Sequence, residues 1–285
     1  MELPPEVEHI LDVALAEDTG SGDVTSRMLV PAGLMGEGQV LVKTPGVLAG
    51  IEVLRRLFLK VDSSLSVAVL VEDGNKIKPG DVVAIVSGRV ASMLGSERVA
   101  LNFLQRMSGI ATLVAEFVNR VNGTRAVIAD TRKTTPGLRW LEKYAVRMGG
   151  GHNHRFNLSD AVLIKDNHLA ALRATGMSLG EIVKKAKQGA PPGLAVEVEI
   201  TSFEEAKEAL AAGANTIMLD NMIPQQMRPI VKMVAGRAKL EASGGVRLEN
   251  VREIAETGVD IISVGSLTHS VKSLDISLEI ETIKL

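Results

Sequence analysis

The amino-acid sequence predicts an α/β protein with two parts, a mixed α+β domain followed by a parallel β-sheet with its helices. Within the first 90 residues, short β-like runs are separated by Gly, Pro and Asn, which favour turns. Farther along, apolar runs of four or five residues recur, and an amphipathic segment follows each. The last four runs begin 21–23 residues apart, at residues 195, 216, 239 and 260, as is typical of repeated βα units.

The first part is expected to contain two helices and three strands. Residues 5–17 and 51–61 place apolar side chains at helical spacing, and Pro5 suits a first helical turn. The expected strands are 38–44, 65–73 and 81–88. From Ser92 a long helical pattern runs to Gly109, stops there and resumes over 110–121, which predicts two helices joining the parts.

The second part is expected to contain six parallel strands, at 125–130, 161–166, 195–199, 216–220, 239–243 and 260–265. Such a sheet usually closes, or nearly closes, into a barrel whose ligand sites gather at the carboxyl ends of the strands. Each expected strand ends in a polar residue or Gly, which favours one shared rim. Six strands are fewer than the eight of a complete barrel. An open or shortened barrel and undetected strands are both options.

Composition and charge exclude several classes of protein. The 285 residues carry 32 Lys plus Arg against 34 Asp plus Glu, a net charge of −2, so no global basic field attracts nucleic acid or an anionic membrane. The longest uncharged stretches, such as 209–219, are too short to span a membrane. The chain has no Cys, and its acidic start does not resemble a secretory signal, so we expect a cytoplasmic protein.

Positive charge is concentrated between Arg125 and His168. This segment holds eight Arg or Lys, four acids and three His. Arg pairs bidentately with carboxylate or phosphate, and Lys supplies a point charge. The concentration therefore predicts a pocket for a small ligand with several negative charges.

Small residues and carboxylates follow the later strands. Ser243, Gly244 and Gly245 follow one strand and Gly265 ends the next, at the place where barrel enzymes commonly bind phosphate. The alternative is that these glycines only make tight loops. Glu199 and Asp220 end neighbouring strands, and Glu197 shares a strand face with Glu199. These carboxylates suit ribose hydroxyls or Mg²⁺, or else buried ion pairs with the nearby Lys and Arg.

The GHNHR run at 151–155 could suggest a metal site. His152 and His154 are two residues apart, no carboxylate stands at ligand spacing, and Arg155 would repel a cation. A His that donates to a ligand carboxylate is the better interpretation, and a loop His that caps backbone is the alternative. The sequence contains no nucleophile elbow, P-loop or dinucleotide-binding glycine motif, which argues against hydrolase, P-loop and Rossmann classes.

Several motifs, in order and over nearly the whole chain, resemble one family. They are EDTGSGDVTS, SERVALNFLQRMSGIAT, DTRKTTPGLRWLEKYAV, GGGHNHRFNLSDAVLIKDNH, EVE, MLDNM, EASGG and VGSLTHS. Together they resemble quinolinate phosphoribosyltransferase, the decarboxylating nicotinate-nucleotide pyrophosphorylase of NAD biosynthesis. One mild departure is Arg247, where the family pattern suggests a smaller or uncharged residue.

The resemblance implies an N-terminal α/β sandwich domain over 1–110 and an incomplete, open α/β barrel over 111–270. It also implies a C-terminal tail, 271–285, that returns to the first domain, in which 275–285 could supply a strand. Members of the family form dimers or assemblies of dimers, in which an N-terminal domain covers the partner's barrel mouth. The implied substrates are quinolinate and phosphoribosyl pyrophosphate, and the implied cofactor is Mg²⁺.

The resemblance also assigns roles to individual residues. Quinolinate's two carboxylates would be bound by Arg132, His154, Arg155 and Lys165, helped by Thr131 and by Arg98 of the neighbouring chain. Lys133 would lie between the substrates. Glu199 and Asp220 would face the ribose hydroxyls and Mg²⁺. The 5′-phosphate would be held by Ser243, Gly244, Gly245, Gly265 and His269. The implied catalytic residues are Lys133, Lys165, Glu199 and Asp220.

Two rival functions remain open at this stage. A related phosphoribosyltransferase acting on another ring acid, such as nicotinate, should need fewer cations at the ring site. A phosphate-binding barrel that regulates or scaffolds would release no pyrophosphate. The presence of Arg132, His154, Arg155 and Lys165 together favours a dicarboxylate substrate.

Overall fold

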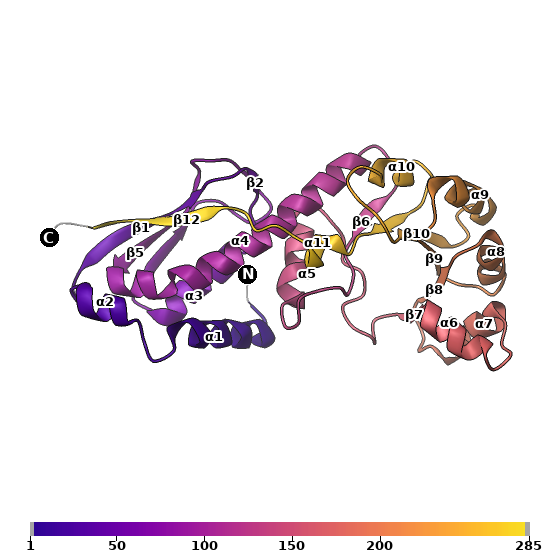
Figure 1. The fold of residues 1–285 in the computed structure, drawn as a ribbon, viewed down its shortest axis with the longest axis horizontal. Helices are drawn as coiled ribbons and strands as arrows, with labels where there is room; N and C mark the ends of the chain where they lie inside the picture. Colours follow the sequence, from indigo (N-terminus) through magenta and orange to yellow (C-terminus); the bar gives the residue numbers. More distant parts are fainter. Residues whose placement is uncertain (1–2, 283–285) are drawn as a thin grey trace. The chain divides into compact units, whose positions relative to one another are not determined.

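A computed structural model describes residues 3–282 (Figure 1). The chain divides into two compact units. Unit 1 holds the described residues up to Ala115, the segment Thr134–Gly150 and the described residues from Leu267 onward. Unit 2 holds Glu116–Lys133 and Gly151–Ser266. The domain limits given above from the sequence remain predictions.

Unit 1 is built on an antiparallel sheet with strand order β12-β1-β5-β3. Its strands are β1 (Met35–Val42), β3 (Ser66–Val69), β5 (Val82–Arg89) and β12 (Ile276–Thr282). The C-terminal strand β12 lies beside β1 and pairs with it from Gly36↔Thr282 to Val42↔Ile276 (Figure 1). Residues 283–285 of the expected tail strand lie outside the described residues. Two short strands, β2 (Gly46–Val47) and β4 (Lys76–Ile77), pair with each other.

The helices of unit 1 bury apolar faces. They are α1 (Pro5–Thr19), α2 (Val24–Leu29), α3 (Ile51–Val61), most of α4 (Val90–Val121) and α5 (Arg139–Met148). On α3 the spacing predicted from the sequence puts Leu54, Leu57 and Phe58 on one side, and all three are 0% exposed. Each such burial stabilises the fold by roughly 1.5–3 kcal/mol. The sequence did not predict α2, β2 or β4, because such short elements show no periodicity.

The predicted break near Gly109 is wrong. Residues 90–121 form the single continuous helix α4. A Cβ atom at Gly109 would lie 2.2 Å from the backbone oxygen of Lys272. This glycine therefore allows another segment of unit 1 to approach the helix closely, and does not end it.

Unit 2 is an open parallel sheet of six strands in the order β6-β11-β10-β9-β8-β7. Its strands are β6 (Val127–Ala129), β7 (Val162–Ile164), β8 (Val196–Ile200), β9 (Thr216–Asp220), β10 (Lys239–Ser243) and β11 (Ile261–Ser263). Five of the six predicted segments contain one of these strands, and the sixth, 195–199, overlaps β8 and ends one residue before it. The edge strands β6 and β7 do not pair with each other among the described residues, so the sheet does not close. The open barrel, rather than a complete one, is confirmed.

Helices cover the outer side of this sheet (Figure 1). They are α6 (Asp166–Arg173), α7 (Leu179–Gly189), α8 (Phe203–Ala211), α9 (Pro224–Val234) and α10 (Val251–Ala255). The short helix α11 (Ser266–His269) begins at the last residue of unit 2 and continues into unit 1. On β8, the buried Val196, Val198 and Ile200 share one face, and Glu197 and Glu199 share the other. The helices α7 and α8 contact β8. The apolar face of β8 therefore packs against the helices, and its acidic face lies on the opposite, inner side of the sheet.

Candidate active site

Strand register brings polar side chains onto the inner face of the unit 2 sheet. Met218 of β9 pairs with Glu199 of β8 on one side and with Glu241 of β10 on the other. Asp220 pairs with Ser243 in the same way. Residues paired across a sheet point to the same face, and so do residues two apart on one strand. Glu199, Asp220, Glu241 and Ser243 therefore all lie on the inner face, near the carboxyl ends of their strands.

The predicted basic residues fall into two sets. Arg139, Lys143 and Arg147 lie on α5 in unit 1, and Arg125 pairs with Asp260. The second set lies in unit 2. Arg132 and Lys133 follow β6 and Lys165 follows β7, whereas Arg155 precedes β7 and donates to the backbone oxygen of Ala161 at 3.3 Å. Only part of the positive charge counted in the sequence therefore belongs to unit 2.

Arg132 and Arg155 are neighbouring, partly buried cations. Burial lowers the pKa of Arg155, and the positive charge of Arg132 lowers it further. The Nε of Arg132 is buried and has no hydrogen-bond partner among residues 3–282. A buried donor without a partner costs about 1–3 kcal/mol, and two like charges repel. Both features are relieved by an anion, which is the ligand predicted for this place.

Lys165 and the two carboxylates Glu199 and Asp220 lie together at the sheet's end. Lys165 Nζ is 3.7 Å from Glu199 Oε1, and the backbone N–H of Asp166 donates to Glu199 Oε2 at 3.3 Å. Burial raises the pKa of Glu199, and the nearby charges of Asp220 and Asp166 raise it as well. A cation between these two carboxylates would relieve their repulsion. This donor set fits Mg²⁺, which takes one or two carboxylates and completes its shell with water and phosphate oxygens.

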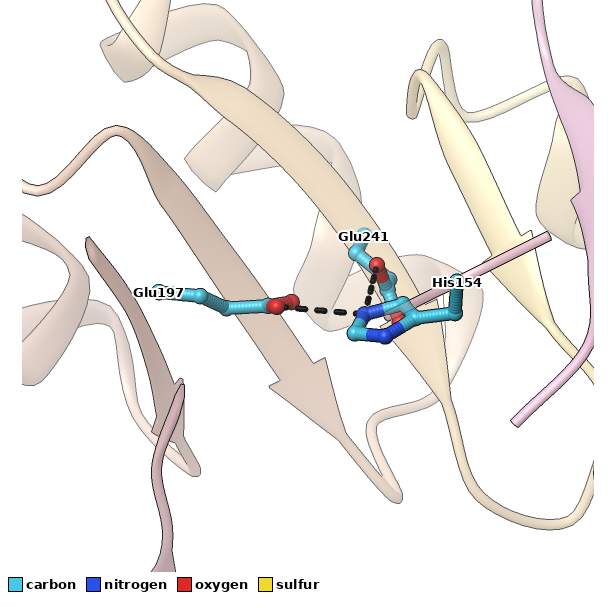
Figure 2. Close-up of side chains that lie close together, drawn as sticks. All are labelled: His154, Glu197 and Glu241. Carbon is cyan, nitrogen blue, oxygen red and sulfur yellow. Dashed lines mark hydrogen bonds and ion pairs between the residues drawn. The ribbon is translucent and has the colours of Figure 1, made fainter. Parts of the chain in front are cut away.

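His154 contacts two buried carboxylates that point to it from separate strands (Figure 2). Its Nε2 lies 3.1 Å from Glu197 Oε2 and 3.5 Å from Glu241 Oε2. Glu197 is 5% exposed and Glu241 1% exposed. Hydrogen bonds to Glu197 and Glu241 raise the pKa of His154 to about 10. The three side chains are close enough to hold a metal ion, a grouping that local sequence spacing could not show because the acids come from distant strands.

The loops after β10 and β11 contain the predicted phosphate-binding residues. Gly244 and Gly245 adopt φ of +89° and +62°, and a Cβ at Gly244 would lie 2.2 Å from Asn221 Oδ1. Asn250 Nδ2 donates to Gly245 O at 3.0 Å, and the backbone N–H of Arg247 donates to Asn250 Oδ1 at 2.8 Å. The loop thus requires glycine for its own conformation. A role for Ser243, Gly244, Gly245 and Gly265 in phosphate binding remains a prediction.

The remaining predicted site residues lie elsewhere or are engaged locally. Arg98 and His269 belong to unit 1. The Arg98 side chain is 59% exposed, and His269 Nδ1 lies 2.6 Å from Ser270 Oγ. Thr131 Oγ1 accepts the backbone N–H of Lys133 at 3.0 Å, and Lys133 is exposed.

Sequence reasoning assigned no role to two residues of this site, Glu241 and Asp130. Glu241 stands two residues before Ser243 on β10, so the alternation that joined Glu197 to Glu199 would have found it. Asp130 is 0% exposed and accepts from Asn153 Nδ2 at 2.6 Å and from the backbone N–H of His154 at 2.9 Å. Its only sequence signal is its place at the end of a strand.

Two family models match this chain and together cover most of it. The C-terminal domain of quinolinate phosphoribosyl transferase matches residues 110–279, and the N-terminal domain matches 23–108. The chain belongs to the quinolinate phosphoribosyltransferase family. It is therefore a transferase of that family, as the sequence motifs predicted.

Individual members of the family are similar along nearly their whole length. A probable nicotinate-nucleotide pyrophosphorylase (carboxylating) of Bacillus subtilis is 44% identical over 275 residues, which is 96% of this chain and 93% of that protein. The quinolinate phosphoribosyltransferase (decarboxylating) 2 of Nicotiana glauca, described as mitochondrial, is 42% identical over 97% of this chain and 83% of its own length. The crystal structure of NadC from Streptococcus pyogenes matches with a TM-score of 0.93 and 41% identity, and covers 100% of both chains.

No helix of this protein within residues 3–282 is long and apolar enough to cross a membrane.

Proposed function

We propose that the protein transfers the phosphoribosyl group of phosphoribosyl pyrophosphate to the ring nitrogen of quinolinate, with loss of CO₂. The products are nicotinate mononucleotide and pyrophosphate, in the de novo synthesis of NAD. The observation that carries the proposal is the pair of neighbouring, partly buried guanidinium groups, Arg132 and Arg155, in the same unit as Lys165 and His154. Membership of the family supports it.

The ring site is assigned to cations because quinolinate carries two carboxylates. Arg132 and Arg155 pair with them as planar donors, and Lys165 adds a point charge. His154 donates from its ring, and Thr131 assists. In the proposed homodimer, or assembly of dimers, Arg98 of the partner subunit completes this ring site.

The phosphoribosyl site is assigned to the acids and the small residues of neighbouring strands. Glu199 and Asp220 face the ribose hydroxyls and would hold Mg²⁺. When bound, this ion neutralises charge on the leaving pyrophosphate. The 5′-phosphate is assigned to the following residues: Ser243, Gly244, Gly245, Gly265 and His269.

The two substrates are both strongly anionic, so bringing them together costs Coulomb energy that a neutral pocket cannot offset. The basic residues supply that compensation, and Lys133 lies between the substrates. The ring nitrogen then uses its lone pair to form a bond to C1′, while the C1′–oxygen bond breaks and its electron pair leaves with pyrophosphate. The transition state resembles an oxocarbenium ion, whose positive charge nearby carboxylates favour.

Decarboxylation follows from the new charge on the ring. Once the nitrogen is quaternary, the bond between C2 and the 2-carboxylate breaks and CO₂ leaves. The electron pair of the broken bond stays on C2. A proton then replaces the carboxylate, and no general base is required. Lys165 and the two arginines hold the ring through this step.

One assay tests this function. The protein is incubated with quinolinate, phosphoribosyl pyrophosphate and Mg²⁺, and CO₂ and nicotinate mononucleotide are measured. We expect both products in equal amounts, with pyrophosphate. A protein that uses nicotinate in preference to quinolinate, or that releases no pyrophosphate with either acid, would contradict the proposal. We further propose that the reaction takes place in the cytoplasm, which suits a chain without Cys.

A further inference from the structure

Asn221 links two strand ends that the proposed function assigns to one substrate. It directly follows Asp220, the last residue of β9, and Ser243 ends the neighbouring strand β10. Asp220 and Ser243 form the last pair between these strands, and the backbone N–H of Asn221 donates to Ser243 O at 2.8 Å just beyond that pair. Asn221 therefore joins the carboxylate assigned to ribose and Mg²⁺ to the turn assigned to the 5′-phosphate.

The backbone of Asn221 adopts a conformation that most residues avoid. Its φ is +52°, and among the described residues Ala235, at +48°, is the one other non-glycine residue with a positive φ. A Cβ atom is disfavoured in this left-handed region, and Asn tolerates it better than most residues because its short amide can form local hydrogen bonds. The contacts of the amide show what this conformation provides.

Both ends of the Asn221 amide meet a part of the phosphoribosyl site. Nδ2 donates to Asp220 Oδ2 at 3.0 Å. Oδ1 lies beside Gly244, where an added Cβ atom would be only 2.2 Å from it. Gly244 itself has a φ of +89°, so the turn and the amide fit together because residue 244 is glycine. One side chain thus contacts both the carboxylate and the turn.

The bond to Asp220 also acts against a repulsion. Burial raises the pKa of Glu199, and the charge of Asp220 raises it further, so the two carboxylates interact unfavourably. This repulsion favours rotamers of Asp220 that point away from Glu199. An N–H donor at Oδ2 stabilises the negative charge of Asp220 and restricts the rotation of its side chain. The two carboxylates can then face the same ribose.

We propose that Asn221 is a positioning residue, which holds the Asp220 carboxylate and the Ser243–Gly244 turn in one arrangement so that a single phosphoribosyl group meets both. The ribose hydroxyls lie at the carboxylate while the 5′-phosphate lies at the turn. Asn221 itself does not touch the substrate in this arrangement. This inference deepens the proposed function and rests on it.

A purely structural role for Asn221 predicts a different result. If Asn221 only forms the bend after β9, glycine and aspartate should both replace it, because both tolerate a positive φ. Asn221→Gly keeps the backbone conformation and removes the amide. Asn221→Asp keeps the shape of the side chain and removes the Nδ2 donor. The two variants therefore separate the bend of the backbone from the bond to Asp220.

The first test measures binding of nicotinate mononucleotide to the full-length protein by isothermal titration. This ligand carries the ribose and the 5′-phosphate, and it does not react without pyrophosphate. We expect both variants to raise its Kd about 10- to 100-fold, the range for loss of a side chain that orients a ligating group. Their melting temperatures should stay within about 4 °C of the wild-type value, since one partly exposed hydrogen bond is lost.

Steady-state kinetics supplies the second test. In both variants the KM for phosphoribosyl pyrophosphate should rise about 10- to 100-fold, while the KM for quinolinate stays unchanged, because Asp220 and the turn are assigned to the phosphoribosyl group. The matched control is Ala235→Gly, which makes the same change at the other left-handed residue, at the end of α9. It should alter neither KM nor the Kd.

The outcomes distinguish this inference from the function on which it rests. An unchanged Kd for nicotinate mononucleotide in either variant would overturn the positioning role. So would an equal rise in both KM values, or a loss of binding that only follows a fall in melting temperature. A wild-type protein that neither binds nicotinate mononucleotide nor forms it from quinolinate would instead refute the proposed function.

Discussion

Replacement of Arg132 should separate substrate binding from folding. The change Arg132→Met removes the guanidinium and keeps most of the aliphatic stem, so lost packing contributes little. The buried Nε has no hydrogen-bond partner among residues 3–282, so its removal breaks no such bond within the described structure. In the proposed complex, however, the same group pairs with a substrate carboxylate.

The expected changes in kcat/KM and in unfolding free energy follow from the substrate complex and the free protein, respectively. Truncation of one partner of a buried charge pair costs about 2–5 kcal/mol, which corresponds to a loss of about 30- to 5,000-fold in kcat/KM for quinolinate. In the free protein, the charge of Arg132 lowers the pKa of Arg155, which means that it disfavours the charged form of Arg155. Its removal relieves that repulsion. The free energy of unfolding should therefore rise, by about 0.2–1 kcal/mol.

Steady-state kinetics and thermal unfolding, with and without quinolinate, measure both effects. The variant should lose activity, melt no earlier than the wild type, and gain less thermal stabilisation from quinolinate. Arg125→Met is the matched control, because Arg125 is an exposed arginine of unit 2 that pairs with Asp260. If Arg132→Met loses less than tenfold in kcat/KM, or loses activity only in proportion to a fall in stability, Arg132 does not bind the substrate.

Three further predictions concern other parts of the molecule. Arg98→Ala should raise the KM for quinolinate, and its heterodimers with Lys133→Ala should recover activity; no recovery in verified heterodimers would argue against a shared site. Gly109→Ala should destabilise the protein by about 1–3 kcal/mol in denaturant unfolding, because the added Cβ would lie 2.2 Å from the Lys272 backbone oxygen. An unchanged or higher stability would show that the backbone at Lys272 shifts at little cost. The pKa of His154 is raised to about 10, so the stability from its protonation is complete below about pH 6.5 and is lost as pH rises through 10. The difference in unfolding free energy between wild type and His154→Gln should shrink over that interval, and a constant difference would contradict the raised pKa.

Much of the architecture could be predicted because it repeats. The βα units of the second half recur at nearly constant spacing, and all six predicted segments overlap strands. Helix α3 has the predicted limits, since apolar residues at helical spacing mark its buried side. Gly109 misled the prediction because a helical glycine that admits a neighbouring backbone looks, in sequence, like one that ends a helix.

The candidate site was predictable where its residues end strands and less so elsewhere. Glu199 and Asp220 were found because they close neighbouring strands, and strand ends meet at one edge. The pairing of His154 with Glu197 and Glu241 was not foreseen, since it joins residues 43 or more positions apart through the strand order β10-β9-β8. The count of basic residues in the sequence also overestimated the positive charge of the site, because three of these residues lie on α5, which belongs to unit 1.

The most direct measurement of the central claim compares two ring acids at equilibrium. Isothermal titration of the protein with quinolinate and with nicotinate isolates the second carboxylate, which is the group assigned to the guanidinium pair. We predict that quinolinate binds about 30-fold or more tightly than nicotinate, since one buried charge pair is worth about 2 kcal/mol or more. Equal affinities for the two acids would show that the basic residues of unit 2 do not recognise a dicarboxylate.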